Sequence, residues 1–279
     1  MEDAAFHAEV ETRLSKTVAA ESDELNRQID MFLGVGESLG YRFSPGDRIL
    51  DFGCGIGDTV ALLLERRADA FGVDVMELWG SDHHSYWRGS APPSARVIER
   101  LHKLDAGHYR IPFEDNFFDF CISSQVFEHV FDYREVFSEL GRVLKPGALS
   151  LHLFPGPWSP LEAHINVPII PLCRYRWWLS MWAWLGRRSE RQQDMGWREV
   201  VEVNASIMQN NNYPLRRVLR QAAKASGVRI DFAEHAYITC SRSRPNAIMS
   251  WFDAKRLGWV VSTLLQVLSQ RMMVISKAG

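Results

Sequence analysis

Three glycines and two acidic residues have the types and spacing of a site for a nucleotide-like ligand. An apolar run ends at Asp51 and leads into Gly53, Gly55 and Gly57. Glycine allows positive φ angles and lets a ligand approach the backbone closely. A second apolar run ends at Asp74, whose carboxylate can accept hydrogen bonds from both hydroxyls of a ribose. The pattern predicts a strand, a glycine turn, a helix and a second strand, the front half of a nucleotide-binding βαβ unit.

The glycine spacing argues against a dinucleotide cofactor. The dinucleotide fingerprint G-x-G-x-x-G requires a third glycine at a position where this chain has Asp58 or Val60, depending on the starting glycine. Asp58 would repel a pyrophosphate, whereas Asp51 would attract a cation. A cofactor without phosphates therefore fits better. S-adenosylmethionine, which is adenosine carrying a cationic sulfonium and an amino-acid tail, has these properties.

Further motifs follow in order along the chain. They are D-A-x-x-x-R-I-P-F-E-D-N-F-F-D from Asp105, S-S-Q-V-F-E-H-V from Ser123 and L-K-P-G from Leu144. Together with the glycine turn, they resemble the class I S-adenosylmethionine-dependent methyltransferases. The resemblance covers roughly residues 45–155. It is strongest to the small-molecule branch that includes the ubiquinone and menaquinone C-methyltransferases.

The resemblance implies a cofactor site spread over the ends of four strands. The glycine turn would hold the methionine part and Asp74 the ribose. Asp105 would lie near the adenine amino group, although a plain turn residue is the alternative there. The residues at the end of the fourth strand would border the methionine part. The expected cofactor-binding residues are Asp51, Gly53, Gly55, Gly57, Asp74, Val75, Asp105, Ala106, Ser123 and Gln125.

Alternating apolar runs and helical patterns predict an α/β, doubly wound, Rossmann-like and mostly parallel sheet. The resemblance implies an antiparallel last strand at a sheet edge. We expect a helical N-terminal cap over 1–44 and a methyltransferase domain over 45–279, with apolar insertions at about 155–212 and 241–270. Strands are expected at 49–52, 70–73, 98–103, 118–123, 148–154, 228–232 and 271–277. Helices are expected within 8–39, from the glycine turn to about residue 67, and at 133–143, 214–226 and 246–270.

Two histidines are candidates for the chemistry. Methyl transfer is an in-line displacement that depends on positioning, and a hydroxyl acceptor gains from a general base. His129 follows the fourth strand, with Glu128 either orienting it or facing solvent. His164 lies with Glu162 in the first insertion, which would overhang the site. The structural alternatives are that His129 packs or caps a helix and that Glu162 and His164 are a surface loop pair.

Neither histidine nor cysteine spacing predicts a metal site. His83 and His84 are adjacent but have no third ligand at a suitable spacing. The four cysteines form no C-x-x-C motif and no disulfide framework, so we expect a reducing cytoplasm. The N-terminus does not have the pattern of a secretory signal, and no confident membrane span is expected.

Charge and tryptophan content set the expectations for partners. Residues 1–173 hold 15 Lys/Arg against 27 Asp/Glu, a net charge of −12, and residues 174–279 have a net charge of +10. Four tryptophans between 177 and 184 are flanked by arginines, which is typical of a lipid–water interface. One hypothesis is therefore a surface that docks on the inner membrane leaflet. The alternative for the insertions is that they pack on each other as a lid over a small apolar substrate. The alternative for the charge asymmetry is that the acidic and basic halves dock on each other or are solvated, without an external partner.

The acceptor is predicted only by class. The segments P-L-E-A-H-I-N-V-P at 160–168 and N-N-N-Y-P-L-R-R-V at 210–218 loosely resemble methyltransferases of bacterial surface-polysaccharide synthesis. A small-molecule or lipid-linked glycan hydroxyl is the preferred acceptor. RNA or protein methylation is the alternative enzyme reaction, although nucleic acid is disfavoured because no basic aromatic platform is evident. A non-catalytic scaffold with this fold is the third hypothesis.

Overall fold

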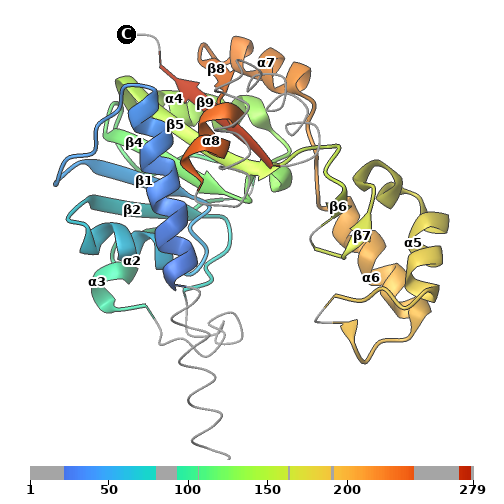
Figure 1. Ribbon diagram of the computed structural model, residues 1–279. Coiled ribbons are helices and arrows are strands. Elements are labelled where there is room, and N and C mark those ends of the chain that lie inside the picture. The colour runs from blue at the N-terminus through green and yellow to red at the C-terminus, as the bar shows by residue number, and fades with distance from the viewer. Residues whose placement is uncertain are drawn as a thin grey trace, which may run out of the picture.

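A single seven-stranded sheet forms the centre of the computed structural model, which describes residues 22–79, 93–105, 107–162, 164–189, 192–241 and 270–277. The strand order is β3-β2-β1-β4-β5-β9-β8 (Figure 1). The five strands β3, β2, β1, β4 and β5 are parallel to one another. The bounds are β1 Arg48–Phe52, β2 Asp69–Asp74, β3 Leu101–Lys103, β4 Phe118–Ser124, β5 Leu144–Pro155, β8 Arg229–Phe232 and β9 Gln270–Ser276.

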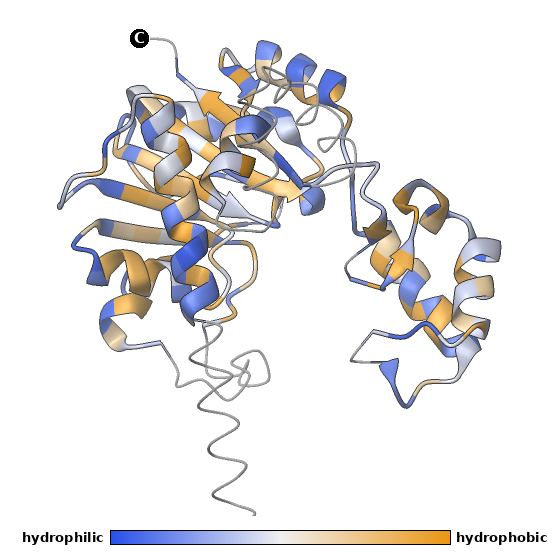
Figure 2. Ribbon diagram, viewed as in Figure 1, coloured by the Kyte–Doolittle hydropathy of each residue, from blue (hydrophilic) through white to orange (hydrophobic). Residues whose placement is uncertain are grey.

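Helices cover both faces of this sheet because its central strands are apolar on both sides. In β1, Ile49 and Leu50 are both fully buried and belong to two separate cores on opposite faces. One core is closed by α4 (Tyr133–Val143) and α7 (Arg216–Ala225). The other is closed by the helix at 22–38, α2 (Asp58–Glu65) and α8 (Glu234–Cys240). Figure 2 shows apolar residues concentrated in the strands. The predicted doubly wound α/β fold is confirmed.

The last strand runs antiparallel as predicted, but its place in the sheet differs from the prediction. β9 pairs with β5 on one side and β8 on the other, so β8 is the edge strand. The reason is burial. All five inner residues of β9 are buried, whereas β8 alternates exposed and buried positions. A strand buried on both faces needs neighbours on both sides, and a short polar strand tolerates an edge.

The third strand begins later than the sequence pattern predicts. Ile98 ends the short helix α3 (Ala95–Ile98), and β3 starts only at Leu101. The Ser94 side chain accepts a hydrogen bond from the Val97 backbone N–H and so caps this helix at its start. The apolar residues at 97 and 98 therefore belong to a helix and not to the strand.

The first insertion folds around a small core of its own, set to one side of the sheet (Figure 1). It contains the hairpin β6 (Leu161–Glu162) and β7 (Val167–Pro168), a 3-10 turn η3 (Ile170–Arg174), and the helices α5 (Arg176–Trp184) and α6 (Trp197–Gln209). Residues 246–269 of the predicted apolar helix and residues 8–21 of the predicted 8–39 helical region lie outside the described residues, whereas residues 22–38 form a helix as predicted. The predicted domain boundaries stay predictions. None of the described helices has both the length and the apolar content needed to cross a bilayer.

Candidate active site

The glycine turn after β1 requires glycine for two different physical reasons. Gly53 and Gly57 have positive φ angles of 85° and 91°, and a Cβ at these positions would meet Val126 Cγ2 at 2.2 Å and Leu101 Cδ1 at 2.7 Å. Gly55 has a φ angle of 56°, and a Cβ there would have nothing within 4 Å. The turn is therefore tightly packed at its two ends and open at its centre, where a ligand could approach the backbone.

Two carboxylates at the ends of β1 and β2 give this turn a preference for cations. Asp51 is only 5% exposed, and its burial, followed by the nearby charge of Asp74, raises its pKa to about 7. Asp74 accepts hydrogen bonds from the backbone N–H groups of Gly55 (2.9 Å) and Met76 (2.9 Å). A positively charged group placed beside these acids would favour the ionised form of Asp51.

The remaining residues predicted near ribose and adenine lie on the surface. Val75 is partly exposed, and Asp105 is exposed. Asp105 Oδ1 accepts a hydrogen bond from the Gly107 N–H at 2.8 Å, which is the local turn geometry of the alternative interpretation. This bond leaves further acceptor capacity on the carboxylate. Ala106 lies outside the described residues.

At the end of β4, the predicted residues point in different directions. Ser123 is buried, and its Oγ lies 2.7 Å from His152 Nδ1, so its side chain is engaged inside the sheet and not at the open end. Burial lowers the pKa of His152 to about 3, which keeps that imidazole neutral. Gln125 is exposed and has a φ angle of 57°, a strained conformation often found at functional sites. Gln28, on the N-terminal helix, donates to Ser124 Oγ at 2.8 Å, so that helix reaches this end of the sheet.

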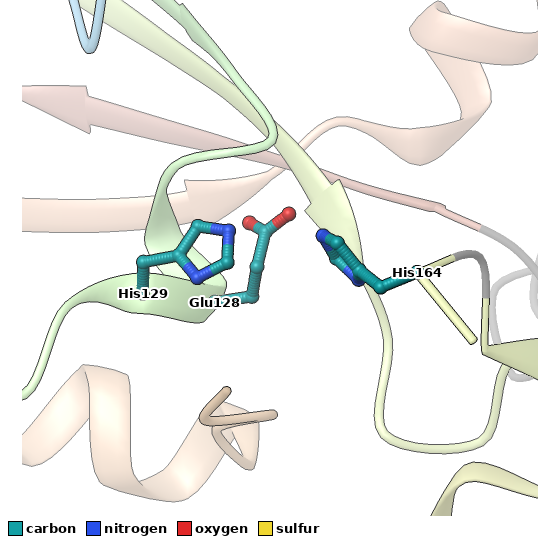
Figure 3. A group of neighbouring side chains, drawn as sticks. All are labelled: Glu128, His129 and His164. Carbon is teal, nitrogen blue, oxygen red and sulfur yellow. The ribbon is translucent and has the colours of Figure 1, made fainter. Parts of the chain in front are cut away.

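The two predicted catalytic histidines lie next to each other, although the sequence separates them by 35 positions. Their ring centroids are 5.5 Å apart at an interplanar angle of 77°. His129 ends the 3-10 turn η2 (Phe127–His129), and His164 lies between β6 and β7. Figure 3 shows the Glu128 carboxylate between the two rings. One potential ligand atom from each of the three residues lies within 4.8 Å of the others.

Glu128 neither faces solvent nor orients a neighbour through a hydrogen bond, so both parts of the sequence-based prediction for it are wrong. Its side chain is fully buried, and neither carboxylate oxygen has a hydrogen-bond partner among the described residues. Burial raises the pKa of Glu128 to about 7. An unpartnered buried carboxyl group is costly to keep, and such groups concentrate at functional sites.

A hydrogen-bond network fixes His164. Its Nδ1 lies 2.6 Å from Glu162 Oε1, and this bond raises the pKa of His164. Glu162 is 1% exposed and also accepts hydrogen bonds from the Tyr213 hydroxyl and from the Ile165 N–H at 2.9 Å. Burial acts to raise the pKa of Glu162, but the bonds from His164 and Tyr213 lower it overall. The alternative of a surface loop pair is therefore wrong.

Two polar residues that complete the cluster, Asn211 and Tyr213, were not among the predicted site residues, although their segment at 210–218 carried the resemblance that concerns the acceptor. Asn211 is buried, and its Nδ2 lies 3.3 Å from His164 Nδ1. Desolvation, and then the charge of His164, lower the pKa of His129. The signal in the sequence is the polar run N-N-N-Y that begins at 210, which carries chemistry only once the fold brings it beside the hairpin.

A cavity of about 570 Å³ reaches the histidine cluster through Asn211, whose Nδ2 lies 3.3 Å from His164 Nδ1. Phe131 also lines it, and residues of α5 and α6 form much of the rest. Asn211 and Asn212 line it as well, and the Asn212 N–H donates to the Glu128 carbonyl at 2.5 Å. Two arginines, Arg174 and Arg176, lie at the same wall. The cavity can hold a small molecule or part of a larger one beside the histidines.

Comparison with known proteins identifies the glycine-turn region. Residues 50–151 match the family described as "Methyltransferase domain". The chain is 32% identical over 107 residues to 24-methylenesterol C-methyltransferase 2 of Arabidopsis thaliana, covering 38% of this chain and 28% of that protein. It is 32% identical over 150 residues to 2-phytyl-1,4-naphtoquinone methyltransferase of Synechococcus elongatus, covering 50% and 61%. The chain thus spans less than two thirds of either relative.

Among solved structures, phosphoethanolamine N-methyltransferase 2 of Haemonchus contortus, in complex with phosphomonomethylethanolamine and S-adenosylhomocysteine, is 20% identical. The match covers 88% of this chain and 52% of that one, with a TM-score of 0.47. The similarity to methyltransferases rests instead on the sequence match and on the ordered motifs. Residues 50–151 match the methyltransferase domain family and carry the motifs that resemble those of the class I S-adenosylmethionine-dependent methyltransferases.

Proposed function

We propose that this protein transfers a methyl group from S-adenosylmethionine to a hydroxyl of a small-molecule or lipid-linked glycan acceptor. The observation that carries the proposal is the contact between the glycine turn and the segment that leads into the histidine cluster. Val126 packs directly on Gly53, and Glu128 and His129 follow it by only two and three residues. A cofactor bound over Gly55 and an acceptor in the 570 Å³ cavity would therefore meet across η2.

The residues around the glycine turn fit a cationic adenosine cofactor. Asp51 and Asp74 supply negative charge, the centre of the turn is open at Gly55, and the Asp74 carboxylate retains acceptor capacity for ribose hydroxyls. When bound, S-adenosylmethionine supplies an electrophilic methyl group. The chain then has to hold an acceptor oxygen in line with the methyl carbon and exclude water.

His129 is the base in this proposal. Its lowered pKa keeps a lone pair available at neutral pH. The acceptor oxygen forms a bond to the methyl carbon, the carbon–sulfur bond breaks with its electron pair left on sulfur, and the hydroxyl proton moves to His129. His164, oriented by Glu162, is placed to hydrogen-bond the acceptor. Such a base contributes roughly 10²–10⁴-fold to the rate.

The exposed aromatic residues of α5 support a lipid-linked acceptor presented at the cytoplasmic face of a membrane. Trp177 is 60% and Trp184 71% exposed, with Tyr175 and Leu185 exposed beside them. Aromatic rings of this kind are favoured at the lipid–water interface. The names of the relatives, a sterol and a phytyl-naphthoquinone methyltransferase, also involve lipid acceptors.

Calorimetric titration with S-adenosylmethionine tests the cofactor half of the proposal. We expect Asp74→Ala to weaken binding at least tenfold, because it removes the ribose acceptor. Asp69→Ala is the matched control, since Asp69 lies at the opposite end of the same strand in a surface ion pair. Wild-type protein that is folded but binds no cofactor would contradict the proposal.

Acceptor and membrane tests follow on the same protein. Glycolipids, free glycans, RNA and protein are incubated with S-adenosylmethionine, and methylated products are identified by mass spectrometry. Methylation of RNA or protein alone would overturn the acceptor class. Co-sedimentation with anionic vesicles tests the membrane surface. We expect Trp177→Ala/Trp184→Ala to reduce binding and Trp197→Ala, an exposed tryptophan on α6, to leave it unchanged.

A further inference from the structure

We propose that Glu128, His129 and His164 form a binding site for one divalent transition-metal cation. The three side chains offer two imidazole nitrogens and one carboxylate oxygen within 4.8 Å of one another. In a tetrahedral site with metal–ligand distances of about 2.0–2.2 Å, such atoms lie roughly 3.3 Å apart. Modest side-chain rotation would close the cluster around an ion. Binding of this cation is a property beyond the proposed methyl transfer and does not depend on it.

The unpartnered carboxylate is the second, independent observation. Both oxygens of Glu128 are buried without a hydrogen-bond partner among the described residues, yet Figure 3 shows them directed between the two rings. A side chain that served only packing would gain from being apolar at this position. A cation bound to it would supply the missing counter-charge and the missing bond together.

The surroundings of His164 have the arrangement found behind metal-bound histidines. Such histidines donate their second ring N–H to a carboxylate, which fixes the tautomer and the ring orientation. Here Glu162 Oε1 lies 2.6 Å from His164 Nδ1. The other ring nitrogen, Nε2, is then available to bind the cation. Glu162 is itself held by Tyr213 and by the Ile165 N–H, so the ring has little freedom to turn.

The donor set selects the class of metal. Two imidazoles with one carboxylate suit zinc, iron(II), cobalt(II) or manganese(II) better than magnesium or calcium, which prefer all-oxygen sites. Three protein ligands leave at least one position open. If methyl transfer occurs as proposed, the acceptor hydroxyl can bind there and lose its proton to solvent at neutral pH. His129 is then a ligand, and it acts as a base only in the metal-free protein.

Cobalt titration of the full chain, freed of affinity tags and treated with a chelator, tests the site. We expect visible d–d absorption bands that saturate at one Co²⁺ per chain and disappear when zinc is added. Glu128→Gln and His164→Ala should each weaken cobalt binding at least tenfold. Glu162→Gln should weaken it about 10–100-fold by loosening His164. His108→Ala is the control and should change nothing, because this exposed histidine pairs with Glu135 and is not a member of the cluster.

Circular dichroism and binding of S-adenosylmethionine are measured on every variant to verify folding. Absence of cobalt bands in folded wild-type protein would overturn the metal site. Equal cobalt affinity of wild type, Glu128→Gln and His164→Ala would overturn it too. Cobalt binding at this site in a protein that binds no S-adenosylmethionine would refute the proposed function and leave the metal site standing, so the two failures are distinguishable.

Discussion

The cofactor end and the acceptor end of this molecule each bury a carboxyl group whose pKa is raised to about 7, but they do so in different surroundings. Asp51 lies at the end of β1, directly before the glycine turn, near Asp74 and with a hydrogen bond from Thr59. Glu128 lies where two distant segments meet, and neither of its carboxylate oxygens has a hydrogen-bond partner among the described residues. The first site is specified by local backbone geometry, and the second by tertiary structure alone.

The largest effect should come from the acceptor end. In metal-free protein, His129→Asn removes the proposed base, so we expect kcat for a hydroxyl acceptor to fall roughly 10²–10⁴-fold. The Kd for S-adenosylmethionine should stay within about twofold, because His129 is not part of the glycine turn. Single-turnover kinetics and calorimetry separate the two quantities. A variant that loses cofactor affinity instead would show that the two ends are not separate sites.

A substitution at Gly53 should disrupt the cofactor end by distorting the backbone of the glycine turn. Gly53→Ala would force a Cβ to within 2.2 Å of Val126 Cγ2 at a φ angle of 85°. We expect a loss of about 2–4 kcal/mol in the free energy of unfolding and at least tenfold weaker cofactor binding. Denaturant unfolding and calorimetric titration measure the two losses, and a variant with wild-type values for both would contradict the tight packing of this turn.

Alanine variants of Gly55 and Gly46 distinguish the cost of backbone strain from the effect of blocking a ligand at the glycine turn. Gly55 and Gly46 both have positive φ, and a Cβ added at either position would meet nothing within 4 Å, but only Gly55 lies in the turn. Each alanine variant should lose about 1 kcal/mol of stability. Only Gly55→Ala should also weaken cofactor binding. Denaturant unfolding and calorimetry measure both effects, and equal cofactor affinity in the two variants would contradict a ligand over Gly55.

The same contrast determines what the sequence could predict. The glycine turn is a local motif, so Asp51 and Gly53 could be placed from spacing alone. The position of β9 inside the sheet depends on burial from both sides, which a strand pattern does not report. The meeting of His129 with His164 depends on how a 3-10 turn and a hairpin loop dock, and no local pattern encodes it.

The pH dependence of cofactor affinity tests the role of Asp51 at the cofactor end. Since burial raises the pKa of Asp51 to about 7 in the free protein, a cationic cofactor binds best to the ionised form. Affinity for S-adenosylmethionine should therefore fall as pH drops below about 7, by at most tenfold per pH unit. Asp51→Asn should bind weakly and without this pH dependence. Calorimetry from about pH 5.5 to about pH 8.5 measures the slope across this range, and a flat wild-type profile would rule out this role for Asp51.

The last prediction concerns the carboxyl group of Glu128, whose oxygens have no hydrogen-bond partner among the described residues. Its folded pKa of about 7 lies above the ordinary unfolded value near 4.3, so the folded state binds more protons between these pH values. Stability contributed by this group therefore falls as pH rises from about 4 to 7. Glu128→Leu removes the buried charge and should raise the free energy of unfolding by about 1–3 kcal/mol at pH 8, and by less at pH 5.

Denaturant unfolding of chelator-treated protein at both pH values measures this gain, with Glu135→Leu as the control for an acid on α4 that is not fully buried. A gain of equal size at pH 5 and pH 8 would mean that side-chain hydrophobicity, and not the buried charge, is responsible. A stabilised variant that no longer binds cobalt would link the cost of Glu128 to ligand binding, because a residue retained against stability is retained for a function.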